Sequence, residues 1–283
     1  MSLSVVSPGM LTLIQDAGRP GFGSSGVGRS GAFDRAALRQ ANLLVGNPED
    51  APALEVLGGG LRLRATREHV LAVTGAVGPV AVGGHPVEHG RSCVVFADQE
   101  VTLGTFDVGL RAYLAVGGGV LADEVLGSAS TDTLSGLGPA PVPAGAKLRC
   151  GMPSGPPPDA MDIPALIASG STNVDVVLGP RDDWFTDAAV ARLLASAWTV
   201  TPTSDRIGIR LDGPELERAR EGEIPSEPCV FGSIQVTSAG LPVVLGPDHP
   251  VTGGYPVIAV VADHHLDRLA QLRPGEVLRF RRG

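Results

Sequence analysis

Four clusters of polar residues in glycine-rich segments could carry chemistry in this chain. They lie at residues 15–19, 127–132, 204–210 and 248–255, and each places a carboxylate, hydroxyl or guanidinium group beside backbone that a ligand can approach closely. Short polar side chains at turns more commonly bond to the local backbone. The clusters therefore predict a ligand site made from some of these residues and structural turns made from others.

Residues 26–31 match the dinucleotide-binding pattern Gly-x-Gly-x-x-Gly and precede a predicted helix. The dinucleotide fold also needs a buried strand directly before the motif, and the segment 19–25 is instead rich in glycine and serine. The pattern therefore indicates a loop, not a Rossmann fold. It is either a flexible loop with glycines at positive φ or a rim whose N–H groups and Arg29 face an anionic ligand.

The histidine pairs do not predict a metal site. His85 and His89 have helical spacing, but the segment 83–90 is turn-like, so a solvated hairpin is favoured over a zinc site. His264 and His265 stand at the start of a predicted helix and are expected to be exposed.

Lys147 is the only lysine of the chain, and it lies in a strand-like segment. A P-loop needs Gly-Lys-Ser/Thr, so the chain has none. Attached biotin and a Ser-Ser-Lys amidase site each need a suitably placed lysine, so neither is predicted here.

Composition excludes several further classes. The net charge is −8 with no Lys/Arg-rich face, which is unfavourable for nucleic-acid binding. Three distant cysteines without CxxC spacing, no signal-peptide pattern and no apolar run of about 18 residues predict a reduced cytoplasmic protein that does not enter a membrane.

The elements that must position the polar clusters are mainly strands. Glycine (39) and proline (24) are abundant, and short apolar runs separated by turns are typical of a barrel or sandwich. A helix is predicted over 34–45, with Asp34 as its N-cap and Gly46 at its end. The strands expected in this half are 11–14, 61–64, 69–73, 92–96 and 110–116.

The second half repeats this organisation. Helices are predicted over 187–197 and 264–271, with Thr186 and Asp263 as N-caps. Strands are expected at 174–178, 207–211, 233–236, 241–245 and 257–261. The segment 143–149, a turn feeding a closing strand, is echoed at 274–279, which predicts two related barrels. We place the domains at 1–150 and 173–283, joined by a Gly/Pro-rich linker at 151–172.

Long motifs along nearly the whole chain resemble one protein family. Examples are Gln-Asp-Ala-Gly-Arg-Pro-Gly at 15–21 and Tyr-Leu-Ala-Val-Gly-Gly-Gly at 113–119. The other matching segments are 7–9, 31–34, 41–48, 54–55, 126–132, 179–180, 183–185, 204–211, 232–236, 252–256 and 271–275. On these motifs the chain resembles the family of allophanate hydrolase subunit 2 and the 5-oxoprolinase C subunit (KipA-like), which includes a biotin-dependent carboxyltransferase.

The resemblance implies a mainly β fold of two cyclophilin-like β-barrel domains with a few short helices. It implies a KipI-like, allophanate hydrolase subunit 1-type partner and, in 5-oxoprolinase complexes, a third, lactam-utilisation subunit. The leading expectation is the C subunit of such a complex, helping ATP-dependent opening of a small cyclic amide such as 5-oxoproline. The ATP would be bound here or by a partner subunit, and the chain alone is expected to be inactive. One alternative is the carboxyltransferase component of a biotin-dependent urea or amide carboxylase. Another is a non-catalytic regulator of a KipI-like kinase inhibitor.

The expected catalytic residues are Asp248, Asp16 and Arg19. Asp248 would bind or polarise the substrate amide, while Asp16, Arg19 and Arg206 would hold charged groups. The expected substrate-binding residues are Gly28, Ser30, Ser130, Arg206, Gln235, Thr252, Gly253, Gly254 and Tyr255.

The segment 248–256 departs from the family pattern Asp-Arg-Gln-Thr-Thr-Gly-Gly-Tyr-Pro. His249 and Pro250 replace the Arg-Gln pair, and proline has no backbone N–H to donate. This departure predicts a different substrate or weaker activity.

Overall fold

The computed structural model describes residues 2–153, 155, 170–220, 222 and 224–283. These residues form two compact units. Unit 1 comprises the described residues of Met1–Arg19, Ser30–Asp132 and Gly136–Ala168, and unit 2 comprises those of Pro20–Arg29, Thr133–Ser135 and Ser169–Gly283. The linker predicted at 151–172 falls largely on residues outside this description, so the boundary there stays a prediction. Two short segments of the N-terminal half, 20–29 and 133–135, group with unit 2.

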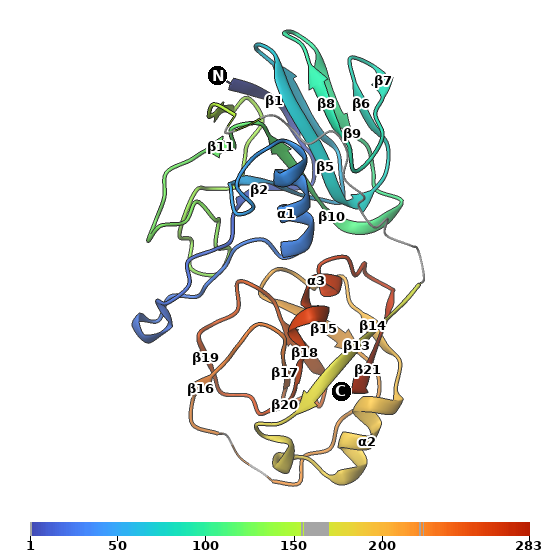
Figure 1. The fold of residues 1–283 in the computed structure, drawn as a ribbon. Helices are drawn as coiled ribbons and strands as arrows, with labels where there is room; N and C mark the ends of the chain where they lie inside the picture. Colours follow the sequence, from blue (N-terminus) through green and yellow to red (C-terminus); the bar gives the residue numbers. More distant parts are fainter. Residues whose placement is uncertain (1, 154, 156–169, 221, 223) are drawn as a thin grey trace. The chain divides into compact units, whose positions relative to one another are not determined.

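Unit 1 is built from two β-sheets around an apolar core, and a second apolar cluster lies beneath helix α1 (Arg35–Leu44) (Figure 1). The first sheet has the order β11 (Val120–Leu121), β12 (Lys147–Cys150), β1 (Ser2–Pro8), β4 (Leu61–Ala65), β9 (Glu100–Leu103), β6 (Val80–Val82) and β7 (His85–Pro86). The second has the order β2 (Leu11–Gln15), β3 (Ala53–Leu57), β10 (Val108–Val116), β5 (His69–Val77) and β8 (Ser92–Val95). Strand β4 alternates buried Leu61 and Leu63 with exposed Arg62 and Arg64, as expected for a strand with one face on the core.

Helix α1 (Arg35–Leu44) packs against β5 and β10. The predicted cap is confirmed, because the Asp34 carboxylate accepts a hydrogen bond from Ala37 N at 2.9 Å. Gly46 follows the helix with φ of 72°, a left-handed conformation that ends helices.

A buried tyrosine joins the start of this helix to the sheet. Tyr113 OH donates to Glu55 Oε2 at 2.6 Å and accepts from Asp34 N at 2.8 Å. Burial, and then the negative charge of Glu55, raise the pKa of Tyr113 well above its ordinary value. The phenol therefore remains a neutral donor that fixes helix α1 on β10.

Unit 2 contains a closed seven-stranded barrel. Around the barrel the order is β13 (Ser171–Leu178), β20 (Val257–Val261), β17 (Ser233–Val236), β18 (Pro242–Leu245), β15 (Gly208–Asp212), β14 (Trp198–Val200) and β21 (Val277–Arg282). Helix α2 (Asp187–Ala195) packs on β21, and Thr186 caps it as predicted, with Oγ1 accepting from Ala189 N. A separate pair is formed by β16 (Glu227–Pro228) and β19 (Thr252–Gly253).

The predicted mainly β fold class with few short helices is confirmed. Each echoed segment forms a strand that pairs with the first strand of its unit: β12 pairs with β1, and β21 pairs with β13 in the closed barrel of unit 2. The first pairing is antiparallel and the second is parallel. No helix among the described residues is long and apolar enough to span a membrane.

The last predicted helix needs correction. A 3₁₀ turn at Asp263–His265 leads into a short helix α3 (Leu266–Leu269), and neither has a side-chain cap bond, so Asp263 is not an N-cap. Both histidines were predicted to be exposed. His264 is exposed, but His265 is buried. Its Nδ1 accepts a hydrogen bond from Asp175 N at 2.8 Å, and this contact holds the ring against β13.

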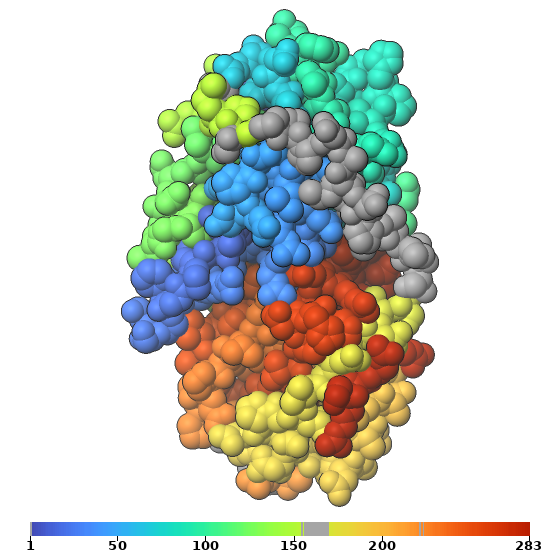
Figure 2. Space-filling model, in the orientation of Figure 1, coloured from blue at the N-terminus to red at the C-terminus, as the bar shows by residue number. Residues whose placement is uncertain are grey.

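The segment 20–29 lies at the surface (Figure 2). It contains one 3₁₀ turn, Gly23–Ser25, and most of its residues are exposed. No strand precedes the Gly-x-Gly-x-x-Gly pattern directly, so the loop interpretation is confirmed and the Rossmann alternative is excluded.

Candidate functional site

In unit 1, Asp16 organises a hydrogen-bonded loop. Strand β2 ends at Gln15 and places the Asp16 carboxylate beside the segment 125–131. Its Oδ1 accepts from Gly18 N at 2.7 Å, Ser128 Oγ at 2.7 Å and Ser130 Oγ, and its Oδ2 accepts from Ala129 N at 2.6 Å. Four donors nearly fill the accepting capacity of a carboxylate. In this geometry Asp16 therefore supports the loop, and its assignment as a catalytic residue stays a prediction.

Arg19 binds backbone carbonyl groups of the same segment. The side chain is buried, Nη2 donates to Ser130 O, and Nε donates to Val125 O at 3.3 Å. Nη1 is buried and has no hydrogen-bond partner among the described residues. Asp16 accepts hydrogen bonds from donors in the segment 125–131, and Arg19 donates hydrogen bonds to its carbonyl groups. The two side chains therefore hold this loop together.

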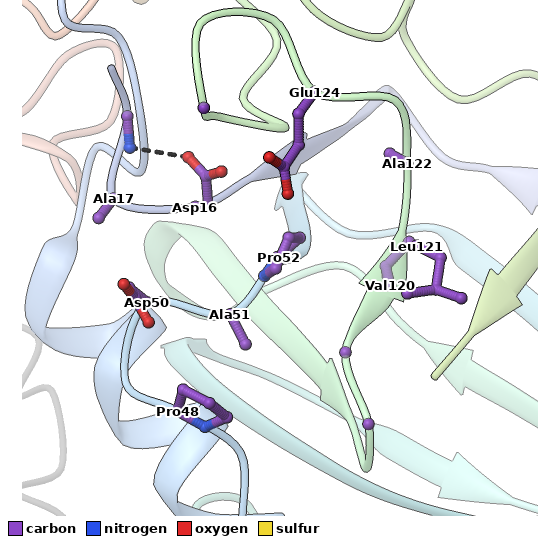
Figure 3. A pocket seen from close by; sticks show the side chains of 14 residues that line it. Asp16, Ala17, Pro48, Asp50, Ala51, Pro52, Val120, Leu121, Ala122 and Glu124 are labelled. Atoms are coloured by element: carbon purple, nitrogen blue, oxygen red, sulfur yellow. Dashed lines mark hydrogen bonds between the residues drawn. The ribbon is translucent and has the colours of Figure 1, made fainter. Parts of the chain in front are cut away.

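A pocket of about 390 Å³ opens beside this loop within unit 1. Figure 3 shows the carboxylates of Asp16, Asp50 and Glu124 on its walls, with the dashed line marking the bond from Gly18 N to Asp16. Backbone of Gly118 and other glycines completes the lining, and no cationic side chain is among the described lining residues. The pocket therefore repels anions and accepts groups that donate hydrogen bonds.

In unit 2, Asp248 forms a buried ion pair with Arg206. Arg206 Nε donates to Asp248 Oδ2 at 2.8 Å and Nη2 donates to Oδ1 at 2.9 Å, with side chains 3% and 0% exposed. Thr133 N and Oγ1 also donate to Asp248 Oδ2, at 2.9 and 2.7 Å. Direct polarisation of a substrate amide was expected from the sequence. In this geometry Asp248 is held by Arg206 and Thr133, and its assignment as a catalytic residue and that of Arg206 as a substrate-binding residue stay predictions.

The loop after Asp248 carries the more accessible predicted residues. Thr252, Gly254 and Tyr255 are exposed, and Thr252 with Gly253 pairs with β16. Gln235 is buried beneath the loop, where Nε2 donates to Tyr255 O at 3.3 Å. Of the predicted substrate-binding residues in unit 2, these three are the exposed ones, and Gly28 and Gly253 are half-buried.

We expect Gly253→Ala to disturb this loop and Gly254→Ala to leave it intact. A Cβ at position 253 would lie 2.4 Å from Gln235 Nε2 and 3.1 Å from Cys229 Sγ, so the Gln235 amide must move and lose its bond to Tyr255. A Cβ at position 254 would meet nothing closer than Ile224 O at 3.9 Å. Gly253→Ala should lower the free energy of unfolding by about 1–2 kcal/mol, and Gly254→Ala by less than about 0.5 kcal/mol. Urea denaturation of both variants measures this, and equal values would contradict the packing described here.

The remaining predicted residues divide between the units. Gly28 is half-buried in the segment 20–29. Ser30 is buried with φ of 54°, and its Oγ donates to Thr131 O at 3.2 Å. The structure thus brings together Asp16, Arg19, Ser30 and Ser130 in unit 1. Unit 2 holds Gly28, Arg206, Gln235, Asp248, Thr252, Gly253, Gly254 and Tyr255.

Three residues with a place in these sites were missed from the sequence: Asp50, Glu124 and Thr133. Asp50 and Glu124 line the pocket of unit 1 from segments more than 70 positions apart in the chain. Thr133 reaches Asp248 across 115 positions. None of these pairings has a local signature in the sequence.

Three ionisable groups, Arg181, Glu227 and Cys229, lie near the loop of unit 2. Arg181 forms a bidentate pair with Glu227 on β16, and this hydrogen bonding lowers the pKa of the Glu227 carboxyl. Burial, and then the charge of Glu227, raise the pKa of the Cys229 thiol. Cys229 is therefore protonated near neutral pH and unsuited to act as a nucleophile. Like Cys93 and Cys150, it is a free cysteine.

One group of potential metal ligands occurs among the described residues: Asp175, His264 and His265. His265 Nδ1 already accepts from Asp175 N, so binding a metal at Nδ1 would leave a buried N–H without a partner. Arg281 also forms an ion pair with Asp175, with 3.3 Å between Arg281 Nε and Asp175 Oδ1. This group is therefore structural. His85 and His89 are not part of such a group among the described residues.

Comparison with known proteins gives consistent matches. The family model described as carboxyltransferase domain, subdomain A and B, matches residues 25–282. The chain is 35% identical to the 5-oxoprolinase C subunit of Escherichia coli (strain K12), over 98% of this chain and 90% of that protein. It is 31% identical to urea amidolyase of Lachancea kluyveri, over 99% of this chain and 17% of that protein. The crystal structure of K. lactis urea amidolyase matches with a TM-score of 0.94 and 29% identity, over 99% of this chain and 18% of that one.

Proposed function

The chain belongs to the family of carboxyltransferase domains, subdomains A and B, and on that premise we propose that it is the C subunit of a 5-oxoprolinase-type complex. The observation that carries this proposal is the match to the Escherichia coli protein, which extends over 98% of this chain and 90% of that protein. The corresponding protein from Haemophilus influenzae is 34% identical over 94% of this chain and 86% of its own length. The complex would act in the cytoplasm, in keeping with three free cysteines.

The reaction would open a small cyclic amide such as 5-oxoproline with the use of ATP. Phosphorylation of the lactam oxygen creates a leaving group and a more electrophilic carbon, which water can then attack. This chain has no P-loop, because its only lysine lies on β12, so ATP would be held mainly by a KipI-like partner or a lactam-utilisation subunit.

The residues of this chain would contribute binding and support. Thr252, Gly254 and Tyr255 present hydroxyl and backbone groups at the surface of unit 2. Asp248, Arg206 and Gln235 hold the loop that carries them. In unit 1, Asp16 and Arg19 would keep the wall of the acidic pocket in place, where substrate N–H groups rather than phosphates would be accepted.

The second candidate is the carboxyltransferase component of a biotin-dependent urea or amide carboxylase. The TM-score of 0.94 with the K. lactis urea amidolyase favours it, although this chain spans less than a fifth of that protein. Biotin would arrive on another chain or domain, since no suitable lysine exists here. A third candidate, raised by the resemblance alone, is a non-catalytic regulator of a KipI-like protein.

The test is to express this chain alone and together with the subunits encoded beside it. We expect the lone chain to be inactive and the assembled complex to hydrolyse 5-oxoproline with consumption of ATP. Turnover of urea that requires bicarbonate and a biotinylated component would instead establish the second candidate. If the lone chain hydrolyses 5-oxoproline as fast as the complex, the subunit assignment is wrong.

A further inference from the structure

Thr133 occupies an unusual place in the chain. It opens a three-residue segment, 133–135, that groups with unit 2 although the residues on both sides of it belong to unit 1. Within unit 2 its N–H and hydroxyl both donate to Asp248 Oδ2, at 2.9 and 2.7 Å. Arg206 Nε donates to the same oxygen at 2.8 Å. Thr133 thus gives this oxygen both a backbone and a side-chain donor.

These two donors act on a carboxylate that water does not reach. The Asp248 side chain is 0% exposed, and its charge is balanced by Arg206, which is itself 3% exposed. A buried ion pair is stable only when its remaining hydrogen-bonding sites are filled. Arg206 engages the carboxylate along one edge, and Thr133 supplies two more donors to Oδ2. Thr133 therefore helps to fix the orientation of the carboxylate and stabilises the charged oxygen by hydrogen bonding.

The orientation of Asp248 matters because it starts the loop that leads to the exposed residues 252–255. Its own N–H donates to Arg206 O at 3.1 Å, so both its backbone and its side chain are held by Arg206. Further along, Val251 O accepts from Cys229 N at 2.9 Å and β19 pairs with β16. The loop is thus tied at its end by β16 and at its start by the group of Arg206, Asp248 and Thr133.

We propose that Thr133 is a positioning residue for the loop 248–255, acting through Asp248. Its place in catalysis rests on the function proposed above, whereas its effect on the loop does not. The alternative is that Thr133 merely occupies the acceptor site that a substrate amide takes during turnover. The two roles predict different kinetic effects. Removing a support lowers kcat, whereas removing a competitor of the substrate lowers KM.

The first test is hydrogen exchange of the full-length chain, comparing Thr133→Val with Thr133→Ser. Valine keeps the shape and the N–H but loses the hydroxyl donor, whereas serine keeps the donor. We expect amides of 133–135 and 248–253 to exchange about tenfold faster in Thr133→Val and within about twofold of the parent chain in Thr133→Ser. The matched control is Thr237→Val, which removes a hydroxyl bond to Leu241 O at 3.2 Å elsewhere in the same unit. Unchanged exchange in Thr133→Val, or equal acceleration in the control, overturns the proposal.

The second test is turnover of 5-oxoproline by the assembled complex, at a temperature where every variant is folded. Thr133→Val should lower kcat about tenfold with little change in KM, and Thr133→Ser should restore it. A lower KM in Thr133→Val would show that Thr133 competes with the substrate and would overturn the positioning role. If the parent complex has no such activity, the proposed function fails, while the exchange measurement still decides whether Thr133 holds the loop.

Discussion

Replacing Asp248 by alanine will lower the free energy of unfolding by about 3–5 kcal/mol, because it leaves the buried Arg206 guanidinium without a counter-charge. The change also deprives Thr133 N and Oγ1 of their acceptor. Urea denaturation followed by circular dichroism measures the effect. This variant should be among the least stable single variants of unit 2.

A double-mutant cycle separates this cause from a simple cavity. Arg206→Ala alone leaves a buried carboxylate, and the double variant Arg206→Ala/Asp248→Ala leaves no buried charge. We expect the double variant to lose less stability than the sum of the two single variants, with an interaction energy of about 2–3 kcal/mol. Additive losses would mean that the ion pair contributes little and that Asp248 is free for another role.

Replacing Asp16 by alanine should destabilise unit 1 by about 2–5 kcal/mol, since two backbone N–H groups and two hydroxyls lose their acceptor together. Thermal and urea unfolding measure the loss. Asp16→Asn should fall between the parent chain and alanine, because its amide retains one acceptor oxygen.

Asp50→Ala provides the matched control for Asp16. Asp50 lines the same pocket but is exposed, and its removal should change stability by less than about 0.5 kcal/mol. If both variants bind or turn over substrate poorly while only Asp16→Ala is unstable, Asp50 contacts the ligand and Asp16 shapes the wall. Equal stability of the two variants would refute the assignment of Asp16 as the organiser of the loop 125–131.

The distinction between supporting and contacting residues changes the interpretation of the polar clusters. In the sequence the charged residues Asp16, Arg19, Arg206 and Asp248 all lie in glycine-rich segments, which favours a ligand site. In the structure all four are buried and bond to other parts of their own unit. In this geometry their hydrogen-bonding groups shape loops, whereas Thr252, Gly254 and Tyr255 are exposed, and the roles of all these residues in substrate binding stay predictions.

The sequence by itself determined the family, the mainly β fold class and most of the elements. Short runs of strand-forming residues between turns predicted strands such as 233–236 and 257–261 with their observed bounds. The run 257–261 is apolar throughout, whereas in 233–236 the polar Ser233 and Gln235 alternate with Ile234 and Val236. Capping of α1 by Asp34 and of α2 by Thr186 was predictable because a cap bonds to an N–H three residues away. The family followed from long motifs that stand in order along the chain, and the match over residues 25–282 confirmed it.

Tertiary structure alone decided how the polar residues are used. The bonds of Asp16 to residues 128–130 span 112–114 positions and those of Asp248 to Thr133 span 115, so no local pattern reveals that these carboxylates are already engaged. The same holds for the buried His265, whose Nδ1 accepts from Asp175 N, 90 positions away in the chain. A carboxylate or imidazole has a fixed number of hydrogen-bonding sites. Sequence determines which groups carry those sites, whereas folding determines whether distant parts of the chain fill them or leave them open to a ligand.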